Sequence, residues 1–233
     1  MPKVKVIILR TAGTNCDLET AFAFEKVNAD CELVHINRLV AGHKKLKNYH
    51  ILAIPGGFTY GDDVASGKIL ANEIKYKLKD DIVNFILSGK LIIGICNGFQ
   101  VLVKSGLLPN TGDSFDKIES TLSINDSGKF EDRWVYLKNQ NAKFKMQNTK
   151  CVWTAGMPEA IYLPIAHAEG KFIPRDKETL DRIKKNCQTV FTYCDEKGQA
   201  QGYPHNPNGS VKHIAGICDP GGRVFGLMPH PER

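Results

Sequence analysis

The chain has 233 residues, of which 42% are hydrophobic and 24% charged, enough to bury a large core without disulfides or a structural metal. Its seven cysteines are odd in number and include no Cys-x-x-Cys pair, which excludes a secreted disulfide framework and the common zinc motifs. The formal net charge of +6 comes from lysines and arginines spread along the chain with no nucleic-acid-binding motif, so we expect no nucleic-acid partner.

The first predicted element is a strand over Val4 to Leu9, an apolar run too short to cross a membrane. No signal-peptide cleavage site follows it, and Pro2 stands where myristoylation needs a glycine, so we expect a cytoplasmic protein without membrane contact. Short β-branched runs then alternate with helically spaced segments. The predicted strands are Cys31 to Ile36, Ile51 to Ile54 and Leu91 to Ile95, and the helical segments are Leu18 to Val27 and Ile69 to Leu87.

Strands that alternate with helices predict an α/β fold, an open and mostly parallel sheet with helices on both faces. Ligands of such sheets bind beyond the carboxyl ends of the strands. Two glycine turns follow predicted strands, Pro55-Gly56-Gly57 and Gly94 to Gly98. We therefore expect these two turns to meet at one edge of the sheet.

The second half of the chain is less regular and predicts an antiparallel extension of this sheet. Turn residues occur at Asn125 to Gly128, before an aromatic run at Trp134 to Leu137. Later runs at Thr189 to Cys194, Ile214 to Ile217 and Val224 to Met228 predict a strand meander. Since no linker or repeat interrupts the sequence, we expect residues 1–233 to form a single domain. The polar segment Asp113 to Gln147 is assigned no role, and its stretch Asn125 to Trp134 shows no clear chemistry.

Cys96 is the first candidate catalytic residue. The frame Gly94-x-Cys96-x-Gly98 after a buried strand has the spacing of a nucleophile elbow, in which small flanking residues allow a strained turn from strand to helix. A thiol has a pKa near 8.5, so the nucleophile needs a base or a helix N-terminus beside it. The alternative is a cysteine that is merely packed at the end of a strand.

Two histidines are candidate bases for this thiol. In Pro229-His230-Pro231-Glu232 the prolines favour extended backbone, which lets Glu232 orient His230 as in a Cys-His-Glu triad. His167-Ala168-Glu169 is a second His-x-Glu sequence. Spacing alone leaves both histidines as candidates.

Acyl chemistry also requires donors for an oxyanion, and backbone amides are the simplest ones. The Asn97 amide directly follows the nucleophile, and the loop Gly56-Gly57-Phe58 permits close approach of a second amide. Neither a dinucleotide fingerprint nor a P-loop is present, so we expect no nucleotide cofactor in this chain, and without a Cys-x-x-Cys pair we expect no metal.

Beyond these derivations, the sequence resembles the class I (triad) glutamine amidotransferases and, more narrowly, the family of glutaminase subunits of phosphoribosylformylglycinamidine synthase. The resemblance extends over nearly the whole chain. It is carried by Thr14-Asn15-Cys16-Asp17, Pro55 to Asp62, Cys96-Asn97-Gly98-Phe99-Gln100, Pro164-Ile165-Ala166-His167 and Met228 to Arg233.

The resemblance implies a flavodoxin-like amidotransferase fold and a role for each matching residue. Cys96 would be the nucleophile, His230 the general base and acid, and Glu232 the residue that orients His230. The remaining implied residues are Gly57 and Asn97 at the oxyanion, Gly57, Phe58 and Gln100 in the glutamine pocket, and His167 and Glu169 near the site.

The resemblance also implies the reaction and the partners. L-glutamine would be hydrolysed through a Cys thioester, and the ammonia passed to a synthetase subunit (PurL-like), with a small third subunit (PurS-like). ATP and Mg²⁺ would bind the synthetase, which forms a C–N bond in purine biosynthesis. The alternatives are the glutaminase of another amidotransferase, a PfpI-like cysteine hydrolase, in which a histidine usually follows the cysteine, and a non-catalytic regulatory module.

Overall fold

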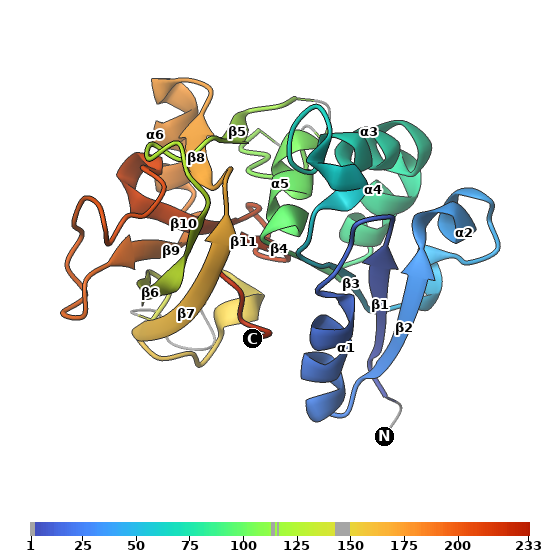
Figure 1. The fold of residues 1–233 in the computed structure, drawn as a ribbon. Helices are drawn as coiled ribbons and strands as arrows, with labels where there is room; N and C mark the ends of the chain where they lie inside the picture. Colours follow the sequence, from blue (N-terminus) through green and yellow to red (C-terminus); the bar gives the residue numbers. More distant parts are fainter. Residues whose placement is uncertain (1–2, 113–114, 116, 143–149) are drawn as a thin grey trace.

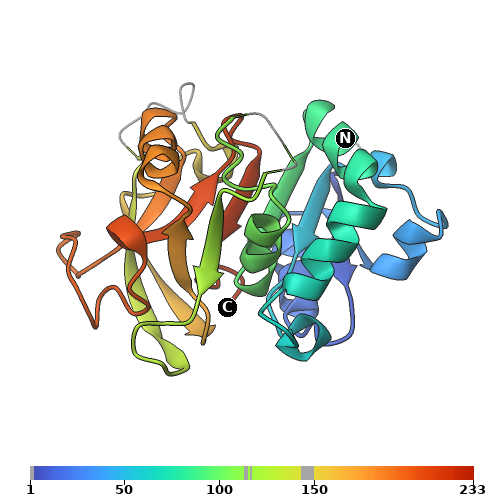
Figure 2. The same cartoon turned by 90° about the horizontal axis from the view of Figure 1, so that it is seen from above.

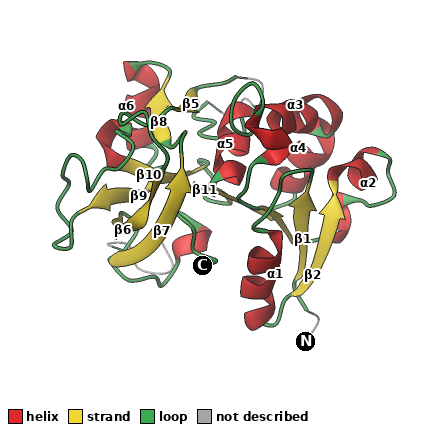
Figure 3. Cartoon of the chain, viewed as in Figure 1, coloured by secondary structure: helices red, strands yellow, loops and turns green. Residues whose placement is uncertain are grey.

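The computed structural model describes residues 3–112, 115, 117–142 and 150–233. Nine strands form one sheet in the order β2-β1-β3-β4-β11-β10-β9-β6-β7, and β5 and β8 form a separate pair (Figures 1 and 3). The strands are β1 (Lys5–Arg10), β2 (Asp30–His35), β3 (Ile51–Ile54), β4 (Leu91–Ile95), β5 (Ser120–Ser123), β6 (Glu131–Asn139), β7 (Ala160–His167), β8 (Lys171–Pro174), β9 (Thr189–Cys194), β10 (Ile214–Cys218) and β11 (Val224–Leu227).

The parallel half of the sheet consists of β2, β1, β3 and β4, and β11 continues it in parallel beside β4. Its central strands read as unbroken apolar runs because helices cover both of its faces. Figures 1 and 2 show α1 on one face and α3, α4 and α5 together on the other. The helices are α1 (Asp17–Lys26), α2 (Ile36–Val40), α3 (Lys68–Lys77), α4 (Lys79–Leu87), α5 (Asn97–Lys104) and α6 (Lys177–Lys185), with short 3₁₀ turns η1 (Leu46–Asn48), η2 (Thr59–Asp62), η4 (Val152–Thr154) and η5 (Val211–His213).

This arrangement confirms the predicted mostly parallel sheet with an antiparallel extension. One local expectation was wrong, because the helical segment over Ile69 to Leu87 divides into α3 and α4 at Leu78, whose φ of −127° is not helical. The sequence analysis also missed β7, which contains Pro164. Proline argues against a strand, but β7 is the edge strand of the sheet, where a missing N–H group is tolerated.

Helix α5 is the most enclosed helix of the described chain, since all eight of its residues are buried. It packs on β3, β4 and β11 and is covered by α3 and β5. A Cβ atom on Gly98 would lie 1.9 Å from the Ile54 carbonyl oxygen, so this close contact with β3 requires glycine. The helix that follows Cys96 is therefore held firmly against the sheet.

The segment Asp113 to Gln147 is described only in part. It contains β5 and β6, and the predicted turn closes with a hydrogen bond of 2.8 Å from the Gly128 amide to the Asn125 carbonyl. Residues 113–114, 116 and 143–147 of this segment lie outside the described residues. None of the helices in the described ranges is long and apolar enough to cross a membrane.

Candidate active site

The two predicted glycine turns meet at the carboxyl edge of the parallel strands, with Cys96 between β4 and α5. Cys96 has φ 51° and ψ −105°, a conformation that L-residues rarely adopt, and its amide donates to the Leu227 carbonyl at 2.8 Å. The backbone thus makes the sharp turn that the Gly-x-Cys-x-Gly spacing predicts.

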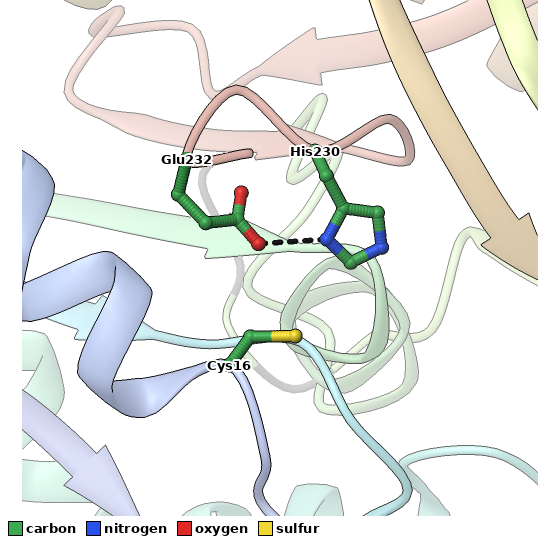
Figure 4. A group of neighbouring side chains, drawn as sticks. All are labelled: Cys16, His230 and Glu232. Atoms are coloured by element: carbon green, nitrogen blue, oxygen red, sulfur yellow. Dashed lines mark hydrogen bonds and ion pairs between the residues drawn. The ribbon is translucent and has the colours of Figure 1, made fainter.

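His230 and Glu232 lie on the short tail after β11, and both side chains are buried. His230 Nδ1 donates to a Glu232 carboxylate oxygen at 2.7 Å, as Figure 4 shows. The His230 amide donates to the Pro164 carbonyl of β7 at 2.9 Å, which fixes the tail against the edge strand. Because Nδ1 carries the proton, Nε2 is the ring atom free to accept one, and it has no partner among the described residues.

Gly56 provides the space in which the His230 ring approaches the cysteine. A Cβ atom on Gly56 would lie 2.8 Å from His230 Cε1 and 3.5 Å from Cys96 Cβ. The imidazole and the cysteine therefore flank the same glycine, and any larger residue there would push the ring away.

The Cys96 thiol is protonated in this resting arrangement. Burial raises its pKa, and the nearby Cys16 and Glu232 raise it further, while the Asn97 amide opposes them. Its sulfur contacts the Ala166 carbonyl of β7 at 3.7 Å. A neutral thiol is a poor nucleophile, so attack requires a base that takes the proton as the new bond forms.

The second His-x-Glu sequence is arranged differently. The Glu169 carboxylate accepts from Lys104 Nζ at 3.0 Å and from the Ser66 amide at 3.3 Å, and it does not bond to His167. His167 is 3% exposed, and neither ring nitrogen has a partner among the described residues. Burial, with a smaller contribution from His230, lowers its pKa to about 3, so His167 is a neutral residue near His230 without a carboxylate to orient it.

The two amides predicted as oxyanion donors, those of Gly57 and Asn97, lie in the loop after β3 and at the start of α5. The Asn97 amide lowers the pKa of Cys96, and Gly57 has a φ of 134° that favours glycine. The Phe58 amide already donates to the Gly13 carbonyl at 2.9 Å. The Gly57 amide has no hydrogen-bond acceptor in the described part of the chain.

The remaining predicted pocket residues differ in their exposure. Phe58 is 46% exposed and stacks on Phe130, with ring centroids 6.4 Å apart. Gln100 is buried, and its amide bonds to the Asn97 side chain at 2.9 Å and to the Glu169 carbonyl at 2.6 Å. Phe58 is thus open to a ligand, whereas the Gln100 side chain is engaged inside the protein.

Comparison with known proteins adds independent information. Residues 3–233 match the model of the CobB/CobQ-like glutamine amidotransferase domain. The chain is 48% identical over 231 residues to the phosphoribosylformylglycinamidine synthase subunit PurQ of Methanococcus maripaludis, covering 98% of this chain and 82% of that protein. This chain belongs to the PurQ family. The PurQ subunit of Dehalococcoides mccartyi is also 48% identical, over 100% of this chain and 86% of its own length.

Solved structures agree with membership of the PurQ family. A chain in the structure of PurLQS from Thermotoga maritima is 32% identical, covers 100% of this chain and 89% of its own length, and superposes with a TM-score of 0.75. A glutamine amidotransferase from the same organism, 18% identical over 100% of this chain and 77% of its own length, shares the fold with a TM-score of 0.53. The PurQ relatives at 32% to 48% identity exclude the alternative of a PfpI-like cysteine hydrolase.

Cys16 and Arg233 are site residues that the sequence analysis missed. The Arg233 guanidinium donates to Cys16 Sγ at 3.1 Å, and burial raises the pKa of Cys16 to about 11. Polar atoms of Cys16, His230 and Glu232 lie within 4.8 Å of one another (Figure 4). Because Cys16 Sγ accepts from the Arg233 guanidinium and His230 Nδ1 is bonded to Glu232, we assign Cys16 to holding the tail. The motif Thr14-Asn15-Cys16-Asp17 marks Cys16 as a residue shared with the family. Its contact with Arg233 could not be predicted, because the two residues are 217 positions apart in the chain.

Proposed function

We propose that Cys96, His230 and Glu232 are the catalytic triad of a PurQ glutaminase formed by residues 1–233 as one domain. The observation that carries the proposal is the His230–Glu232 hydrogen bond of 2.7 Å beside a strained and buried Cys96. The single nine-stranded sheet, which supplies both the elbow and the tail, supports a one-domain description.

In the proposed reaction, Cys96 Sγ attacks the side-chain amide carbon of L-glutamine while His230 Nε2 takes the thiol proton. The amides of Gly57 and Asn97 stabilise the tetrahedral oxyanion. His230 then returns the proton to the departing nitrogen, which leaves as ammonia, and a γ-glutamyl thioester remains on Cys96. Water, deprotonated by His230, attacks the thioester, and glutamate and the free thiol are formed.

The ammonia would be consumed by a synthetase partner that makes formylglycinamidine ribonucleotide from formylglycinamide ribonucleotide and ATP. The relative solved within a PurLQS structure supports a PurL-like synthetase and a small PurS-like subunit as partners. ATP and Mg²⁺ belong to the synthetase in this proposal. Seven free thiols are typical of a reducing compartment, which supports a cytoplasmic location.

The test compares two nitrogen sources in the complex reconstituted with a PurL-like and a PurS-like subunit. Cys96→Ala should abolish glutamine-dependent synthesis and leave ammonia-dependent synthesis unchanged, because only the ammonia source is removed. Cys194→Ala, at a buried thiol on β9, is the matched control and should retain both activities. Equal loss of both activities in Cys96→Ala, or glutamine hydrolysis that persists in it, would refute the proposed division of labour.

A further inference from the structure

The loop between β3 and α3, which carries the Gly57 amide, is unusual in its backbone. Three of its non-glycine residues have positive φ, namely Tyr60 at 56°, Asp62 at 54° and Val64 at 73°. Such conformations persist only where the surrounding structure enforces them. The contacts that hold this loop therefore determine the position of the Gly57 amide.

One of these contacts comes from the residue after the nucleophile. Asn97 Oδ1 accepts from the Thr59 amide at 3.3 Å and from the Thr59 hydroxyl at 2.6 Å. Asn97 Nδ2 donates to Asp62 Oδ1 and to Gln100 Oε1, both at 2.9 Å. Asn97 is 1% exposed, and its carboxamide has every hydrogen-bonding position filled, so it has one fixed orientation.

Asp62 extends the same network to the far end of the loop. Its carboxylate accepts from the Ser66 hydroxyl at 2.9 Å and from the Gly67 amide at 3.3 Å. Lys104 of α5 donates to the Ser66 carbonyl at 2.7 Å. The loop is thus tied through Asp62 and Lys104 to the helix that begins at the nucleophile.

We propose that Asn97 and Asp62 form a clamp of positioning residues that sets the Gly57 amide relative to the Asn97 amide. Asn97 supplies one oxyanion donor from its backbone, and its side chain holds the loop that supplies the other. The clamp rests on the proposed function, because it matters only if these amides stabilise an oxyanion. Its contribution appears in the transition state, where the two donors must act together.

A double-mutant cycle on glutamine hydrolysis in the reconstituted complex tests the clamp. Asn97→Asp places a second carboxylate against Asp62 and should lower kcat by about 10²-fold, the effect of losing one oxyanion donor, with a much smaller change in KM. Asp62→Asn should lower kcat by roughly 10-fold. The pair Asn97→Asp with Asp62→Asn restores a donor–acceptor contact between positions 97 and 62, but not the contacts with Gln100 Oε1 and the Gly67 amide. It should therefore recover part of the loss, about 10-fold over Asn97→Asp alone.

Two further variants separate positioning from folding. Thr59→Val removes only the hydroxyl bond to Asn97 and should lower kcat by about 5-fold, with only the small fall in the urea midpoint that the loss of one buried hydrogen bond causes. Asn139→Asp, at a buried asparagine on the far end of β6, is the matched control and should keep wild-type kcat. Ammonia-dependent synthesis should be unchanged in every variant.

The outcomes distinguish the clamp from the function on which it rests. A wild-type complex that uses ammonia but not glutamine would refute the proposed function and the clamp with it. Normal glutamine use by wild type, with strictly additive effects in the cycle or with losses confined to KM, would overturn the clamp alone. Recovery in the exchanged pair, together with the loss of kcat in Thr59→Val, would establish it.

Discussion

His230 and His167 are neighbouring buried histidines, and their partners give them different chemistry. His230 has a carboxylate on Nδ1, which fixes the tautomer and leaves Nε2 to accept a proton. His167 has no hydrogen-bond partner for its ring among the described residues, and its pKa of about 3 keeps it neutral at any ordinary pH. The sequence contains two equivalent His-x-Glu patterns, and only the contacts of the two carboxylates separate them.

The two histidines should therefore respond differently to removal. We expect His230→Ala to lower kcat for glutamine hydrolysis by about 10³-fold or more, because it removes the base and acid. His167→Ala should lower it by less than about 10-fold, mainly through a packing defect. Glutamate release by the assembled complex measures kcat for both variants, and the urea midpoint of each variant checks that it is folded. The reverse order would reassign the base to His167.

At the scale of elements, the site depends on how α5 meets the sheet. The strand, the turn and the helix around Cys96 follow from local sequence, because an apolar run, small residues and a helical pattern succeed one another directly. The edge strand β7 does not follow in this way, since Pro164 argues against a strand. Its place at the site comes from pairing with β6 and from the tail that bonds to its outer edge.

The contact of α5 with β3 gives a prediction at this scale. Gly98→Ala would place a methyl group 1.9 Å from the Ile54 carbonyl oxygen, so the helix must move away from the sheet. We expect a loss of roughly 2 kcal/mol or more in the free energy of unfolding, as for an overpacked core, and a loss of glutaminase activity with it. Urea unfolding measures the first effect. Gly202→Ala, where no atom lies within 4 Å of the new methyl group, should leave both unchanged.

At the scale of the whole molecule, the site joins the two halves of one sheet. The parallel half supplies the elbow, the loop after β3 and, beyond β11, the tail that carries His230, and the antiparallel half supplies β7, to which this tail bonds. His167 is buried at this junction, and its ring has no hydrogen-bond partner in the described part of the chain. The stability of the folded chain should therefore depend on the protonation of His167.

The lowered pKa of His167 determines whether stability rises or falls with pH. The ring titrates near 6.5 when unfolded and at about 3 when folded, so its contribution is full above pH 6.5 and is lost as the pH falls toward 3. Between pH 7 and pH 5 we expect wild type to lose about 2 kcal/mol more than His167→Gln, measured by urea unfolding. Exposed His43→Gln is the control and should keep the wild-type slope. If the free energy of unfolding fell equally with pH in all three proteins, His167 would not be the buried neutral group that we infer.

The sequence by itself determined the alternation of strands and helices, the elbow at Cys96 and the identity of the candidate residues. These are local features, set by side-chain periodicity and by turn residues a few positions apart. The tertiary structure alone decided which histidine has a carboxylate partner, that Cys16 meets Arg233, and that the Asn97 side chain holds Asp62. The Asn97–Asp62 and Cys16–Arg233 contacts join residues 35 and 217 positions apart in the chain. Glu169 is held away from His167 by Ser66 and Lys104, which lie 103 and 65 positions from it. Only the packing of buried polar groups, each of which requires a partner, determines such contacts.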